Sequence, residues 1–200
     1  GGPPRGAPAE RCGGADARPA AGEARSRLAR PDAHTHASDH VLPERAPAEA
    51  PLMGFREMRL SIEVSKALRE MGFKRPTEIQ SRVISLLLDG RDVIGQAQTG
   101  TGKTAAFGVP LIEGIDENLP QTQALVLAPT RELAMQIGEE LRKIARYIPD
   151  INVVTIYGGA SYGRQFDDLK SAPHVVVGTP GRVLDHLGRG TLKLDNIDYL

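Results

Sequence analysis

The chain of 200 residues has no tryptophan, a single cysteine and a formal net charge of zero. One cysteine, Cys12, excludes an internal disulfide framework and fits a reducing compartment, so we expect a cytoplasmic protein. Balanced charge gives the whole chain no preference for nucleic acid or membranes, so any such surface must be local. Apolar runs such as residues 124–128 are far shorter than a membrane span. We therefore expect one domain with an aliphatic core and no membrane partner.

Residues 1–52 lack isoleucine, phenylalanine, tyrosine, methionine and lysine, and they hold eight of the fifteen prolines. Such a segment buries too little apolar surface to offset its ordering entropy, which predicts a disordered tail. It has no apolar core of a secretory signal, and its seven acidic residues equal its seven arginines, unlike a transit peptide. The first methionine is Met53. The segment is either a genuine flexible tail or an extension upstream of a translation start at Met53.

Five side chains in that tail have the chemistry of metal ligands: Asp32, His34, His36, Asp39 and His40. Metal sites need supporting contacts that orient each ligand. A segment with so few large apolar residues has little to hold ligand geometry, so the sequence favours solvated side chains over a metal site.

A glycine-rich segment at residues 97–104 reads Ala-Gln-Thr-Gly-Thr-Gly-Lys-Thr. It follows a short apolar stretch at residues 92–95, predicted as a strand, and precedes a predicted helix at residues 105–113. Strand, glycine-rich turn and helix in this order are typical of a phosphate-binding loop. A dinucleotide-binding fingerprint starting at Gly100 would need glycine in place of Ala105, so that alternative fails on spacing.

Each residue type in the loop has a chemical use. Gly100 and Gly102 allow main-chain N–H groups to approach a phosphate without a Cβ in the way. The following helix directs its positive end at the same anion. Lys103 supplies charge for the β- and γ-phosphates, and Thr104 supplies a hydroxyl for Mg²⁺. Ala97 departs from the glycine that opens the general pattern.

Strands and helices alternate along the rest of the chain, which predicts an α/β fold with a mostly parallel sheet. Helices are predicted at residues 61–71, 77–88, 105–113, 130–144, 161–170 and 180–188, and strands at residues 92–95, 124–128, 153–157, 174–177 and 197–200. Ligands in such sheets bind at the carboxyl ends of the strands. The turns at residues 96–104, 129–133, 158–159 and 179–182 follow those ends and should share one rim.

Five of these segments together resemble the motifs of the first RecA-like domain of DEAD-box RNA helicases, over about residues 55–200. Residues 72–80, with Phe55 upstream, resemble the Q motif; residues 97–104 resemble motif I, where alanine at the first position is usual; residues 129–133, 158–159 and 179–182 resemble motifs Ia, GG and Ib. The resemblance implies a three-layer RecA-like P-loop NTPase domain at residues 53–200, truncated before the motif II region, after the tail at residues 1–52.

The resemblance implies ATP and Mg²⁺ as cofactors. Lys103 and Thr104 would act in catalysis, with Thr104 at the metal. Gln80 would hydrogen-bond the adenine edge and Phe73 would lie against its ring. On the residues alone, however, Thr77 and Gln80 fit a helix capping box equally well. The full set of implied nucleotide-binding residues is Phe73, Lys74, Gln80, Ala97, Gln98, Thr99, Gly100, Thr101, Gly102, Lys103 and Thr104.

The resemblance also implies that the RNA sugar-phosphate backbone is bound without regard to sequence. The residues implied are Pro129, Thr130, Arg131, Gly158, Gly159, Thr179, Pro180, Gly181 and Arg182. Helix N-termini, glycines and arginines suit phosphate contacts. A purely structural alternative stays open, in which Thr130 and Thr179 only cap helices and the two arginines pair with Glu132 and Asp185.

In the family the fifth strand leads into motif II, Asp-Glu-Ala-Asp, and a second RecA-like domain follows with arginine fingers. Neither lies within the 200 residues, so we expect this chain alone to bind ATP and RNA without hydrolysis. Two interpretations remain: the N-terminal portion of an ATP-dependent RNA helicase, or a non-catalytic module that binds ATP and RNA.

Overall fold

The structure is a computed structural model that describes residues 52–98 and 100–200. The predictions of a disordered tail, of its Asp and His cluster and of Cys12 lie outside the described residues. In the described part the elements are, in chain order, α1 (Ile62–Glu70), α2 (Glu78–Leu88), α3 (Lys103–Gly114), β1 (Ala124–Leu127), α4 (Arg131–Ile144), β2 (Val153–Ile156), α5 (Tyr162–Lys170), β3 (Val175–Gly178) and α6 (Pro180–Gly188).

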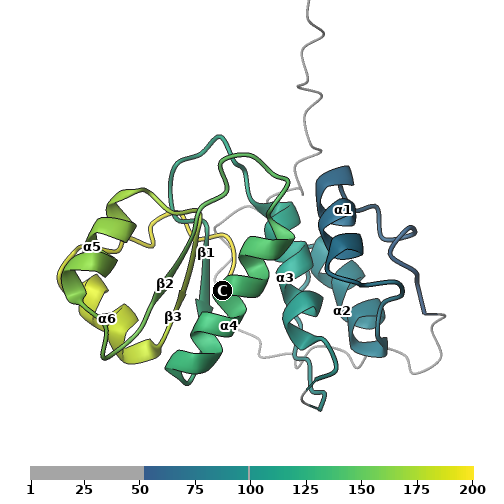
Figure 1. The fold of residues 1–200 in the computed structure, drawn as a ribbon, viewed down its shortest axis with the longest axis horizontal. Coiled ribbons are helices and arrows are strands. Elements are labelled where there is room, and N and C mark those ends of the chain that lie inside the picture. Colours follow the sequence, from purple (N-terminus) through teal and green to yellow (C-terminus); the bar gives the residue numbers. More distant parts are fainter. Residues whose placement is uncertain (1–51, 99) are drawn as a thin grey trace, which may run out of the picture.

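The three strands form a parallel sheet in the order β1-β3-β2, as the alternating pattern predicts. The central strand β3 is buried along its whole length, which explains its uninterrupted valines. Its side chains alternate between faces: Val175 and Val177 join a core with α3 and α4, and Val176 joins a second core with α5 and α6. Figure 1 shows these helix pairs on opposite sides of the sheet, giving three layers.

Helices α1 and α2 lie outside α3, on the side away from the sheet (Figure 1). Ser61 caps α1 by accepting from the Val64 N–H at 3.2 Å, and its own hydroxyl donates to Glu113 of α3 at 2.9 Å. At the far end of α1, Glu70 accepts a hydrogen bond from the Tyr147 hydroxyl, beyond α4. Two polar contacts therefore hold α1 against α3 and against the segment that follows α4.

The prediction of a strand at residues 92–95 is wrong. Residues 91–98 form no regular secondary structure, and Ile94 is 80% exposed. A strand needs a free edge to pair with, and the outer edge of β1 is already taken, because Leu125 N–H donates to the Tyr199 carbonyl at 2.9 Å. Within the described residues, Tyr199 pairs with Ala124 as an isolated parallel bridge rather than as part of a strand. The strand predicted at residues 197–200 is thus reduced to one bridge.

Candidate functional site

The glycine-rich segment, hereafter the phosphate loop (residues 97–104), leads into α3 with two glycines in the left-handed region. Gly100 has φ +80° and Gly102 has φ +81°, values that side-chain-bearing residues rarely adopt. Gly102 is the N-cap of α3, and among the described residues no side-chain hydrogen bond caps that helix. The first N–H groups of α3 therefore remain available to an anion, as the sequence pattern requires.

The phosphate loop is closed on itself by its own side chains. The Lys103 ammonium donates to the Ala97 carbonyl, and the Thr101 hydroxyl donates to the Gln98 carbonyl at 2.7 Å. The intervening Thr99 lies outside the described residues. A phosphate that enters the loop must draw Lys103 away from Ala97, so the lysine is close to its expected position but is engaged by the main chain.

The capping box at the start of α2 is confirmed, and it also holds the phosphate loop. Gln80 is fully buried; its Oε1 accepts from the Thr77 N–H at 2.9 Å, while its Nε2 donates to the Gly102 carbonyl at 3.0 Å. The Thr77 hydroxyl donates to the Thr101 carbonyl at 2.8 Å. The sequence predicted the cap, but the two bonds from Thr77 and Gln80 to the loop were not foreseen.

Phe73, predicted to lie against an adenine ring, packs against the core and contacts Phe55 edge to face, with ring centroids 6.3 Å apart. Its neighbour Lys74 is exposed. Phe55 thereby orders the segment before α1 against the turn before α2.

Glu140 of α4 is a site residue that sequence reasoning missed. Its carboxylate hydrogen-bonds with the hydroxyl of Thr104, the predicted Mg²⁺ ligand. Burial raises the pKa of Glu140 above its usual value, while Thr104 and then Lys143 act in the opposite direction. Helical spacing marks Ile137, Leu141 and Ile144 as the inner face of α4, but no pattern reveals that Glu140 meets the phosphate loop.

The other predicted turns lie together at the carboxyl ends of the strands; we call residues 129–131, 158–160 and 179–182 the rim turns. Register aligns them, because Leu127 and Ile156 both pair with Gly178. The Arg131 guanidinium lies 4.9 Å from the centre of the Tyr157 ring. Figure 1 shows the phosphate loop at the same end of the molecule, where α4 also begins. Helix α4 connects the two, because it begins at the rim turn of residues 129–131 and its Glu140 contacts Thr104 of the phosphate loop.

The structural alternative for the rim residues is confirmed for Thr130, but not for Thr179 or Arg182. Thr130 does cap α4, accepting from the Leu133 N–H at 3.2 Å. Thr179 occupies the N-cap position of α6, but its side chain makes no capping bond, and Pro180 follows in the first turn. Asp185 pairs with Arg189 at 2.9 Å, whereas Arg182 donates to Gln165 at 3.0 Å. Gly158, Gly159 and Gly181 have open space where a Cβ would stand, apart from Arg131 near Gly159.

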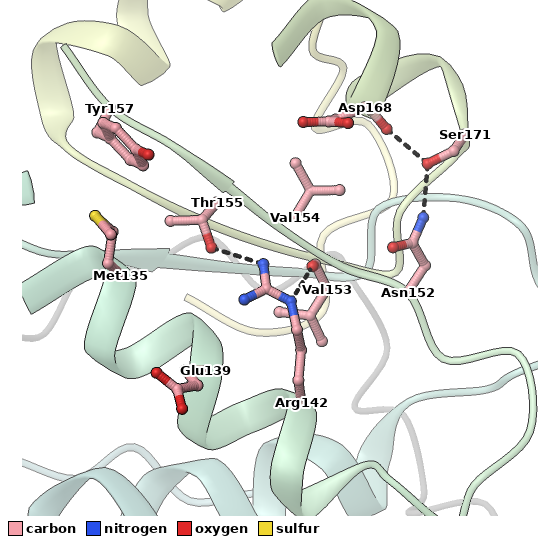
Figure 2. Close-up of a pocket in the computed structure, with 10 residues that line it drawn as sticks. All are labelled: Met135, Glu139, Arg142, Asn152, Val153, Val154, Thr155, Tyr157, Asp168 and Ser171. Atoms are coloured by element: carbon pink, nitrogen blue, oxygen red, sulfur yellow. Dashed lines mark hydrogen bonds between the residues drawn. The ribbon is translucent and has the colours of Figure 1, made fainter. Parts of the chain in front are cut away.

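A pocket of about 460 Å³ lies away from these residues, between α4, the edge strand β2 and the end of α5 (Figure 2). Arg142 crosses it, donating from Nε to the Val153 carbonyl and from Nη2 to the Thr155 hydroxyl, both at 3.0 Å. Asn152 donates to the Ser171 hydroxyl at 2.6 Å. Its polar side chains mostly bond to one another, which indicates a structural role.

In the part of the chain that the structure describes, no three histidine, cysteine, aspartate or glutamate residues are grouped to hold a metal ion, and no helix has the length and apolar character needed to cross a membrane.

Comparison with known sequences places these features in a family. Residues 77–200 match the family model described as DEAD/DEAH box helicase. The DEAD-box ATP-dependent RNA helicase CshA of Geobacillus kaustophilus is 54% identical over 143 residues, covering 72% of this chain and 30% of that protein. CshA of Listeria monocytogenes is 52% identical over 146 residues, covering 73% and 28%. The chain thus spans under a third of the length of these relatives.

Solved structures agree in fold. A DEAD box protein from Methanococcus jannaschii superposes with a TM-score of 0.68 at 44% identity, over 72% of this chain and 39% of that one. The Saccharomyces cerevisiae protein Dbp5, solved with RNA and ADP BeF3, gives a TM-score of 0.64 at 35% identity, over 72% and 36%. With a RecA-like fold, a phosphate loop that leads into a helix without a side-chain cap, and a family match across residues 77–200, this chain belongs to the DEAD/DEAH box helicases.

Proposed function

We propose that this chain is the N-terminal portion of an ATP-dependent RNA helicase, which binds ATP at the phosphate loop and RNA at the rim turns. The observation that carries the proposal is the uncapped start of α3, with Gly102 at φ +81° and Lys103 directly after it. Main-chain N–H groups, a helix dipole and an ammonium converge there, which is the chemistry that a triphosphate needs.

On nucleotide binding, Lys103 would exchange the Ala97 carbonyl for a phosphate oxygen. The Thr104 hydroxyl, which contacts Glu140, is the group suited to Mg²⁺, an ion that neutralises charge on the phosphates. Glu140 then stands close enough to orient that hydroxyl. The Lys103 exchange replaces a bond from an ammonium to a neutral carbonyl with a bond from that ammonium to an anionic phosphate oxygen, which is the stronger kind.

Adenine recognition by Gln80 is consistent with the bonds that it already makes. A side-chain amide can donate two hydrogen bonds and accept two, and Gln80 uses one of each for Thr77 and Gly102. The remaining pair matches the N6 and N7 positions of adenine. Because Gln80 is fully buried, base contact requires the segment from Phe73 to Gln80 to open.

RNA binding at the rim turns would rest on the exposed Arg131 and on main-chain N–H groups near Gly158, Gly159 and Gly181, with Thr179 free to donate its hydroxyl. None of these groups reads a base edge, so we propose binding to the RNA backbone. Hydrolysis would need acidic residues and a second RecA-like domain from a longer protein, since the tetrad Asp-Glu-Ala-Asp is absent from these 200 residues.

Calorimetric titration of ATP with Mg²⁺ into wild type and Lys103→Ala tests the nucleotide site. We expect wild type to bind ATP and the variant to bind about ten-fold or more weakly, because a charge-assisted hydrogen bond is lost. Lys193→Ala, at an exposed lysine outside the site, is the matched control. Equal affinity for wild type and Lys103→Ala would remove Lys103 from the phosphate site.

Phosphate release separates the two interpretations of function. For the chain alone with RNA, we expect no release above the Lys103→Ala background. If the chain is part of a helicase, a longer protein that also contains the Asp-Glu-Ala-Asp tetrad and a second RecA-like domain should show RNA-stimulated release. An extended protein that still releases no phosphate would support a non-catalytic binding module.

A further inference from the structure

Gln165 of α5 is a buried amide whose two ends both carry hydrogen bonds. It is 3% exposed; its Nε2 donates to the Tyr157 carbonyl at 3.0 Å, and its Oε1 accepts from Arg182 Nη1 at 3.0 Å. A buried amide satisfied at both ends fixes the distance between its two partners, because moving either one leaves a polar group unpaired.

One partner, Arg182, belongs to a rim turn, and the other, Tyr157, adjoins a different one. Tyr157 directly precedes Gly158 and Gly159, while Arg182 lies in the first turn of α6. Arg182 Nη1 also lies 3.5 Å from the Ala160 carbonyl, on the other side of the glycine pair. The glycine turn is therefore held at both ends against the start of α6.

The Arg182 guanidinium is turned into the protein rather than toward solvent. Its residue is half-buried, and the guanidinium lies 5.7 Å from the centre of the Tyr162 ring. That ring stacks on the fully buried His186 with centroids 4.5 Å apart. Arg131, by contrast, is exposed on the rim. The two arginines that the sequence pattern treats alike therefore have different surroundings.

We propose that Gln165 and Arg182 are positioning residues that hold the glycine turn in the shape in which its N–H groups meet RNA phosphates, and that Arg182 does not itself neutralise a phosphate. This inference rests on the proposed RNA binding at the rim turns. It adds Gln165, which lies outside the five motifs, to the residues that build the site, and it changes the role of Arg182 from charge donor to brace.

Salt dependence distinguishes a brace from a phosphate contact. Each phosphate neutralised on single-stranded RNA adds about 0.7 to the slope of log affinity against log salt. Binding of a labelled single-stranded RNA would be measured by fluorescence anisotropy at several salt concentrations, with the full chain. Arg131→Gln is expected to reduce the slope by about 0.7, because Arg131 contacts phosphate in the proposed complex.

Gln165→Met keeps the length of the side chain and removes both hydrogen bonds. We expect RNA affinity to fall by about three- to ten-fold with an unchanged salt slope, since a loop is misplaced but no charge is lost. ATP affinity, measured on the same samples, should equal that of wild type. Wild-type RNA affinity in a folded Gln165→Met would overturn the proposal.

Arg182→Lys is the second variant, needed because Gln165→Met could unfold the chain. Lysine keeps the charge, but its ammonium lies one bond closer to the main chain than Arg182 Nη1, which bonds both Gln165 and Ala160, so a brace predicts the same three- to ten-fold loss as above. Arg164→Lys, at an exposed position of α5, is the matched control and should bind as wild type does. Full affinity for Arg182→Lys would overturn the proposal.

The double variant Gln165→Met with Arg182→Lys completes the test. If the two residues act as one brace, the double variant should bind RNA no less tightly than the single variant with the lower affinity. If they act independently, their losses of binding free energy should add. Additive losses would overturn the shared role. Failure of wild type to bind RNA at any salt concentration would instead contradict the proposed function.

Discussion

Gln80 Nε2 donates to the carbonyl of Gly102 at 3.0 Å, so the start of α2 and the last turn of the phosphate loop are one hydrogen-bonded unit. Thr77 adds a second bond, to Thr101, within the same unit. A nucleotide that moves the loop disturbs the bonds to Thr77 and Gln80, and a base that bonds to Gln80 contacts a side chain that already holds the loop. Base recognition and phosphate binding are therefore expected to be coupled in free energy.

The first prediction concerns Gly102 and Gly100, which share a left-handed backbone but differ in surroundings. A Cβ at Gly102 would lie 2.3 Å from Gln80 Nε2, whereas nothing lies within 4 Å of one at Gly100. Both alanine variants incur backbone strain of about 1–2 kcal/mol. Gly102→Ala should additionally break the Gln80 bond, so chemical denaturation should show the larger loss of stability there, with ATP binding abolished.

Equal stability loss in Gly100→Ala and Gly102→Ala would show that the Gln80 contact contributes nothing. The comparison is internal, because both variants carry the same change of backbone strain.

The second prediction uses Gly178 and Gly181, on either side of the start of α6. Gly178→Ala places a Cβ 2.7 Å from Val183 and 2.8 Å from Ile156, so we expect it to destabilise the fold by about 1–3 kcal/mol. Gly181→Ala meets nothing within 4 Å and should stabilise α6 by about 0.5–1 kcal/mol. RNA affinity of Gly181→Ala should nevertheless fall, because a methyl group blocks approach to the main chain. Unchanged affinity would exclude Gly181 from the RNA contact.

The third prediction concerns the pKa of Glu140, which burial raises above its ordinary value of 4.5. The folded state therefore binds this proton more tightly than the unfolded chain does, so the contribution to stability is present below pH 4.5 and is lost as pH rises through the folded pKa. Glu140→Gln should show a higher Tm than wild type at pH 7 and the same Tm near pH 4. A pH-independent difference in Tm would rule out this linkage.

The fourth prediction concerns the pKa of His186, which burial lowers from 6.5, with the nearby Arg182 as the second cause. The unfolded chain then binds this proton more readily, so wild type should lose stability as pH falls from about 6.5 toward the folded pKa. His186→Gln removes the titration and should flatten the dependence of Tm on pH in that range. Because glutamine also changes the packing against Tyr162, the slope is the informative quantity rather than Tm itself.

Local sequence signals predicted the parts of the fold that local chemistry determines. Thr77 with Gln80, Thr130, and the glycines of the phosphate loop have the roles in the backbone that their residue types indicate. The prediction of a strand at residues 92–95 was wrong; a strand depends on an available edge, and Tyr199 bonds along the outer edge of β1. Apolar pattern alone carries no information on which edge is free.

The sequence likewise did not predict the long-range side-chain contacts. Gln165 is polar at a helical position where an exposed side chain would be equally ordinary, and Glu140 stands beside the apolar face of α4 rather than on it. Their partners, Arg182 and Thr104, are 17 and 36 positions away. Nothing in residue type distinguishes a buried amide that bonds at both ends from one that faces water.

Arg142 donates hydrogen bonds to the Val153 carbonyl and the Thr155 hydroxyl (Figure 2). These two bonds have a consequence for association between molecules. β2 ends the sheet, and its outward main-chain groups would otherwise offer a template for a foreign strand. A guanidinium already bonded there would have to be displaced, and its charge would then face the incoming backbone. The sheet is thereby protected against growth by strand addition on that side.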